Sequence, residues 1–204
     1  MEDTTTHVPQ DVASPAADAI PEEFVLTLRK PLKNGPVEYE TITLREPTVA
    51  QLAESEQFEG VAAAADAISA VGGVPKAVVL QMGARDHRAA VAYLDRFFAA
   101  GKNIGADFAE PDPTDISDAL TITLRKPVTF DGKTYSEINL REPTSAEWIE
   151  WDKLTGTAAD IKAISLISNI PALAIKQIGA RDFLAAARYV GHFFTDAPTT
   201  GVQS

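Results

Sequence analysis

The hydrophobic positions of this chain first alternate and then change to a helical period, and that order occurs twice. In residues 24–30 apolar side chains fall at every second position, and residues 39–44 alternate in the same way. Alternation at period two is typical of half-buried β-strands. Asn34-Gly35 lies between the two runs and favours a chain reversal. We therefore predict a β-hairpin at the start of the pattern.

Helices are predicted directly after the hairpin. Thr48 precedes the first helical run and Gln51 stands three positions later, which is the spacing of a capping box. Gly60 is expected just past the end of this helix, at the C′ position, because glycine adopts positive φ without steric cost.

The remaining helices of the unit are short. One is predicted over about residues 62–71, where the apolar side chains share a face, and another begins at Pro75 as its first helical residue. The last is expected to run from Asp86, as its N-cap, to Phe98. The unit is thus a hairpin followed by three to four short helices.

The whole pattern recurs 96 residues later. The string Leu-Arg-Glu-Pro-Thr occupies residues 44–48 and again 140–144, and residues 24–100 align with 120–196 without a gap at 31 identical positions of 77. Chance similarity does not produce this agreement. The second hairpin is expected over residues 120–125 and 135–140, with Asp131-Gly132 as its turn, displaced by one position from the turn of the first. The predicted fold class is therefore α+β, in two tandem copies.

This duplication predicts five segments. They are an acidic disordered tail (1–21), repeat 1 (22–100), an acidic linker rich in Pro and Gly (101–117), repeat 2 (118–196) and a flexible C-terminal tail (197–204).

The acidic charge belongs to the predicted tail and linker. The formal net charge is −11, of which residues 1–23 contribute −6 and residues 101–118 contribute −4. The two repeats are close to neutral, so they offer no electrostatic footprint for nucleic acid. The chain has no cysteine, which excludes disulfides, and it has no apolar run of membrane-spanning length or classical signal peptide.

Catalytic chemistry is not indicated. His7 lies in the predicted tail, and His87 and His192 are each replaced by another residue in the other copy, so neither belongs to the shared design. No serine has a nucleophile-elbow context and no phosphate-binding loop is present. We expect no enzyme activity and no catalytic, cofactor-binding or metal-binding residues.

Four repeated arginines at the strand ends are candidates for partner binding: Arg29, Arg45, Arg125 and Arg141. In one interpretation they only terminate strands, with Glu46 supporting the following helix through its dipole. In the other they contact acidic groups of a partner.

The aromatic residues also divide into core and contact candidates. One member of each pair Phe97-Phe98 and Phe193-Phe194 is expected in the core, which leaves Phe98 and Phe194 as candidate apolar contacts. Trp148 stands where repeat 1 has a leucine and is expected in the core. Trp151 replaces a serine, so it predicts either an interface or local packing within repeat 2.

The repeats resemble the tail assembly chaperone family of long-tailed bacteriophages. The resemblance covers both repeats, and in repeat 2 it lies in residues 124–127, 131–135, 140–144, 170–171, 180–183 and 193–194. Family members are usually a single such unit, so the duplication leaves the stoichiometry with a partner open.

The resemblance implies a non-enzymatic late protein of the host cytoplasm that binds the tape measure protein and keeps it soluble while the tail tube assembles around it. It implies absence from the mature virion, with the tail tube protein as a further partner. Self-association is a separate expectation, because a unit this small gains stability from packing against another copy or a partner. The charge distribution and the lack of a long apolar run predict neither nucleic acid nor membrane as partners. Two units on one chain would hold one client at two places. The alternative is a structural subunit of the tail tube or baseplate that remains in the virion.

Overall fold

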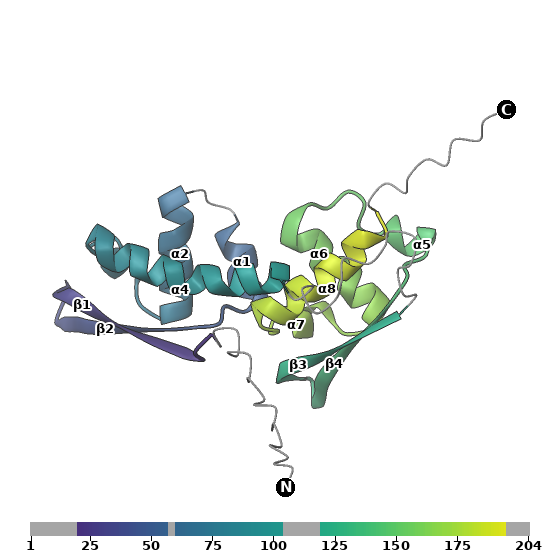
Figure 1. Cartoon of the computed structure of the whole chain (residues 1–204), viewed down its shortest axis with the longest axis horizontal. Coiled ribbons are helices and arrows are strands. Elements are labelled where there is room, and N and C mark those ends of the chain that lie inside the picture. Colours follow the sequence, from purple (N-terminus) through teal and green to yellow (C-terminus); the bar gives the residue numbers. More distant parts are fainter. Residues whose placement is uncertain (1–19, 57–59, 104–118, 195–204) are drawn as a thin grey trace, which may run out of the picture.

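The computed structural model describes residues 20–56, 60–103 and 119–194, and the predictions for both tails and most of the linker fall outside these ranges. Figure 1 shows two units side by side, with the helices on one side of the molecule and the hairpins on the other. The elements of repeat 1 are β1 (Glu23–Asn34), β2 (Val37–Arg45), α1 (Val49–Ser55), α2 (Gly60–Gly72), α3 (Lys76–Val79) and α4 (Ala84–Asn103). Those of repeat 2 are β3 (Ala119–Phe130), β4 (Lys133–Arg141), α5 (Ser145–Trp148), α6 (Gly156–Ser168), α7 (Ala172–Ile175) and α8 (Ala180–His192). The predicted α+β fold in two copies is confirmed.

Each hairpin is a separate two-stranded antiparallel sheet. The strands are longer than predicted, because both continue past the alternating runs to the turn. The turns are Gly35-Pro36 and Asp131-Gly132, which are equivalent positions, so the expected displacement of one turn by one residue was wrong. Gly35, Asp131 and Gly132 all have positive φ, which is what a two-residue hairpin turn requires.

The pairing register shifts at the same place in both hairpins. The shift lies between Thr27 and Leu32 in β1 and between Thr123 and Val128 in β3. Proline within these segments has no N–H to donate to a strand ladder, which favours the interruption. The backbone N–H of Arg29 turns instead to the carboxylate of Asp86 in α4, at 3.1 Å.

The same contact in repeat 2 joins the N–H of Arg125 to Asp182 at 2.8 Å. Both aspartates are almost completely buried. They were predicted as N-caps, which was wrong, because α4 and α8 begin two residues before them, at Ala84 and Ala180. Each aspartate instead connects its helix to the hairpin. A buried carboxylate needs such partners, because unpaired it would lose its hydration without compensation.

The predicted capping boxes are present at α1 and α5, with Thr48 bound to Gln51 and Thr144 bound to Glu147. The prediction for Gly60 and Gly156 was wrong. Both have positive φ, but each begins the following helix rather than ending the preceding one. The α4 helix continues to Asn103 and so enters the segment assigned to the linker, and Pro75 and Pro171 are caps that precede α3 and α7 rather than their first residues.

The apolar faces of the strands and helices form one continuous buried cluster that extends through both repeats. Its fully buried large side chains include Ile42, Leu44, Ile68 and Phe97 in repeat 1. The corresponding repeat 2 positions Ile138, Leu140 and Ile164 are equally buried, whereas Phe193 is only partly buried.

Candidate functional site

The repeats contact each other through different edges. Residues 46–50 of repeat 1, which include part of the duplicated Leu-Arg-Glu-Pro-Thr string, lie against residues 176–181 of repeat 2. Thr48 and Gly179 pair as in an antiparallel bridge. The N–H groups of Val49 and Ala50 donate to carbonyls of repeat 2 at 3.0 and 2.9 Å, and the N–H of Ala180 donates to the Pro47 carbonyl at 2.9 Å.

Arg181 is the central side chain of this interface. Its guanidinium donates to the Glu46 carboxylate at 2.7 Å, and its backbone N–H donates to the same carboxylate at 2.9 Å. The guanidinium also lies over the ring of Phe97, 5.2 Å from the ring centroid. The hydrogen bond that Arg181 donates to the Glu46 carboxylate raises the pKa of Arg181 above its ordinary value. Charge-assisted bonds of this kind stabilise a partly desolvated contact more than neutral ones do.

A second carboxylate crosses the interface at the start of α6. Glu56 accepts from the backbone N–H and the hydroxyl of Thr157. It therefore caps a helix of the other repeat, where the helix dipole favours negative charge. Burial, and then the nearby charge of Glu56, raise the pKa of Asp160 in the same helix.

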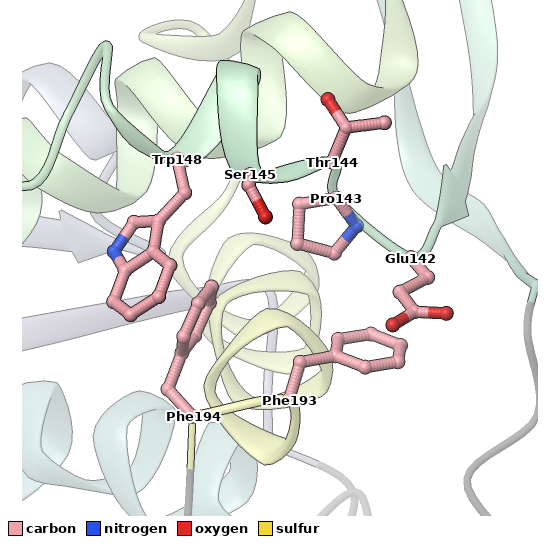
Figure 2. A pocket seen from close by; sticks show the side chains of 7 residues that line it. All are labelled: Glu142, Pro143, Thr144, Ser145, Trp148, Phe193 and Phe194. Atoms are coloured by element: carbon pink, nitrogen blue, oxygen red, sulfur yellow. The ribbon is translucent and has the colours of Figure 1, made fainter.

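In repeat 2, residues 142–145 are equivalent to residues 46–49 of repeat 1. They line an open pocket of about 390 Å³ at the end of the molecule that is far from repeat 1. Its lining residues are Glu142, Pro143, Thr144, Ser145, Trp148, Phe193 and Phe194. Figure 2 shows Trp148 and Phe194 on one side of the pocket and Glu142 and Phe193 on the other. The pocket thus combines a carboxylate with three aromatic rings.

The two tryptophans differ in burial, and only one of them lies where it was expected. Trp148 is 47% exposed, so its expected place in the core was wrong, and its ring lies 4.7 Å from that of Phe194. Trp151 is 6% exposed and meets Phe194 edge-on at 6.4 Å. Local packing, one of the two alternatives for Trp151, is therefore present, and its partner is Phe194. Helical periodicity missed this because α5 ends at Trp148, which places Trp151 in the turns that follow.

The four candidate arginines are exposed and each is paired within its own repeat. Arg29 binds Asp86, Arg125 binds Asp182, Arg45 binds Glu23 and Arg141 binds Glu147. The first two pairs link a strand to a helix, which supports a structural role. Phe98 is partly buried and Phe194 is 38% exposed.

Sequence reasoning did not select Arg181, Glu142 or Phe193. The signal for all three was the duplication itself. A residue kept in both copies need not have the same surroundings in both, because only one copy of each edge can face the other repeat.

A family model described as phage tail assembly chaperone proteins, E, or 41 or 14, matches residues 25–99 and again 121–195. The chain belongs to this family of phage tail assembly chaperones. The two matches coincide with the two structural repeats, so the tail assembly chaperone unit is present here as a tandem duplication. The curated proteins and the solved structures with which the chain was compared contain no match.

Two features that would suggest other classes of function are not found in the described part of the chain. No helix there is long and apolar enough to cross a bilayer. No group of three or more His, Cys, Asp or Glu side chains in those same ranges is arranged to hold a metal ion.

Proposed function

We propose that this chain is a non-enzymatic tail assembly chaperone that binds the tape measure protein, keeps it soluble in the host cytoplasm and promotes assembly of the tail tube around it. The family match supports a role in tail assembly. The tail tube protein is a second partner in this proposal, and the chain leaves before the virion is complete.

The observation that carries client binding is a set of exposed apolar side chains in residues 148–154, here called the apolar segment. Trp148 is 47% exposed, Ile149 71% and Leu154 43%. Leu52, at the repeat 1 position of Trp148, is 6% exposed. Three large apolar groups exposed within seven residues are typical of a binding surface rather than of a scattered protein exterior. Phe194, beside Trp148, extends this surface, and Phe98 and the four paired arginines are candidates for peripheral contacts.

Co-expression with the tape measure protein of the same phage tests the proposal. We expect the tape measure protein to be soluble and to co-purify with the tagged chain, and to precipitate without it. Ile149→Asp together with Leu154→Asp places two charges on the apolar segment and should weaken co-purification by about tenfold, because desolvating them opposes an apolar contact.

Leu173→Asp is the matched control, because Leu173 is 59% exposed in the same repeat but lies in α7, outside the apolar segment. A tape measure protein that is equally soluble on its own would overturn the proposal. Mass spectrometry of purified virions separates it from the alternative, since a structural subunit of the tube or baseplate would remain in the particle.

A further inference from the structure

We propose that the pocket of repeat 2 binds residues 80–85 of a second copy of this chain, so that copies associate head to tail. The inference concerns the chain alone and does not depend on the identity of the client. It follows from the duplication. Within the chain, residues 46–50 of repeat 1 bind residues 176–181 of repeat 2. Each of these two segments has a second copy, residues 142–146 and residues 80–85, that is not used in this interface.

The pocket of repeat 2 is lined by the counterparts of the repeat 1 residues that contact Arg181. Glu142 corresponds to Glu46, which binds Arg181, and Phe193 corresponds to Phe97, which lies beneath its guanidinium. Pro143 and Thr144 correspond to the residues that meet Ala180 and Gly179. The rings below the site also agree: Tyr93 meets Phe97 edge-on at 5.2 Å, and Tyr189 meets Phe193 edge-on at 5.1 Å.

The segment that would enter the pocket is also present and exposed. Residues 83–86 repeat the sequence Gly-Ala-Arg-Asp of residues 179–182. Gly83, Ala84 and Arg85 are exposed, whereas Ala180 is completely buried. A Cβ at Gly179 would meet Glu46 Oε1 at 2.9 Å, but one at Gly83 would meet nothing within 4 Å.

The charges of the two free edges are complementary. Within residues 20–56, 60–103 and 119–194, neither the Arg85 side chain nor the Glu142 side chain forms an ion pair. Their counterparts Arg181 and Glu46 bind each other. In a docked copy, Arg85 would pair with Glu142 and lie over Phe193. The N–H of Ser145 would donate to the carbonyl of Met82 and that of Ala146 to the carbonyl of Leu80, as Val49 and Ala50 donate to Ile178 and Lys176 at the interface between the repeats.

These two edges cannot meet within one chain. Phe97 contacts Arg181 in repeat 2 and lies 13 residues after the first residue of α4, so the start of this helix is about 20 Å away from that contact. Figure 1 shows α5, which borders the pocket, at the opposite end of the molecule. The contact is therefore between copies, and because its two surfaces differ, it generates a ring or a helical filament rather than a closed dimer.

The contact between copies should be weaker than the one within the chain. The bond from Thr157 to Glu56 has no full counterpart, because Val61 and Asp152 occupy those positions and Val61 has no hydroxyl. The buried Val49 is replaced by Ser145. Association should therefore depend on protein concentration.

Sedimentation velocity of the full-length chain alone, over a wide concentration range, tests the proposal. We expect reversible growth from monomer to dimer and larger species. Ala84→Glu should abolish it, because the longer charged side chain would have to fit into a contact where the equivalent Ala180 is fully buried. Folding should be unaffected, since Ala84 is exposed at the first position of α4, where an acidic residue is favourable. Ala92→Glu, at another exposed position of α4, is the matched control and should associate like the wild type.

Charge exchange identifies the pairing residues. Arg85→Glu alone and Glu142→Arg alone should each weaken association by about tenfold or more, and the two together should restore it to within about threefold of the wild type. A wild-type chain that stays monomeric at all concentrations would overturn the proposal. So would association that Ala84→Glu leaves unchanged, which would assign the pocket to a different occupant such as the client.

Discussion

The two copies of Glu-Pro-Thr, at residues 46–48 and 142–144, have the same sequence and opposite surroundings. In repeat 1, Pro47 is buried and Glu46 binds Arg181. In repeat 2, Thr144 and Glu142 are exposed at the border of a pocket. Both strings end a strand and cap a helix, so the shared sequence specifies the local turn. The difference in burial comes from position in the duplicated chain, because only repeat 1 has another repeat docked on this edge.

The largest expected effect is the difference in lost stability between alanine variants of Phe97 and Phe193. Phe97 is fully buried, so Phe97→Ala should destabilise repeat 1 by about 3–5 kcal/mol. Phe193→Ala should cost repeat 2 roughly half as much, because the ring is only partly buried and lines the pocket. Both tryptophans lie in repeat 2. Urea unfolding followed by tryptophan fluorescence therefore reports repeat 2, and circular dichroism reports both repeats. Equal losses for the two variants would contradict the comparison.

A smaller difference in stability is expected between alanine variants of the equivalent residues Arg181 and Arg85. Arg181→Ala removes the partner of a half-buried carboxylate and the cation over Phe97, and should cost about 1–3 kcal/mol of stability at the interface. Arg85→Ala should change stability by less than about 0.5 kcal/mol, because Arg85 is exposed. Thermal unfolding of both variants at a low protein concentration measures the difference without contributions from self-association. Similar melting temperatures for the two would show that the ion pair within the chain is not stabilising.

The smallest expected effect is a pH dependence of stability that the capping box of α5 has and that of α1 lacks. The hydrogen bond from Arg141, followed by that from the Thr144 N–H, lowers the pKa of Glu147 to about 2, whereas Gln51 in repeat 1 does not titrate. A lowered carboxylate pKa stabilises the folded state above the unfolded pKa of about 4.3, and this contribution is lost as pH falls from there towards 2. Glu147 is near the surface, so we expect less than about 1 kcal/mol, reduced further by salt.

Glu147→Gln makes the second capping box chemically equal to the first. The difference in repeat 2 stability between this variant and the wild type should shrink as pH falls below about 4.3. Tryptophan fluorescence during urea unfolding at several pH values measures it. A difference that does not change with pH would rule out the charged pair as its cause.

The sequence predicted the hairpins and the capping boxes, because each depends on residues close together in the chain. It predicted the duplication because identical residues recur at one fixed offset of 96 residues. The roles of Asp86 and Asp182 were missed, since their partners are backbone N–H groups 57 residues away in a strand. The pocket was missed for a related reason. Which copy of an edge is covered depends on how the repeats dock, and no local pattern in residues 140–148 specifies that.

The Lys-Pro dipeptides at residues 30–31 and 126–127 have a further consequence for solubility. In the described residues each strand has a hydrogen-bonded neighbour on one side only, so its other edge is available to unrelated strands. Long regular edges of this kind promote aggregation, and lysine and proline suppress it. Both dipeptides lie where the register shifts, near the middle of β1 and β3. They divide each edge into two short pieces, which protects the chain from forming intermolecular sheets at high concentration.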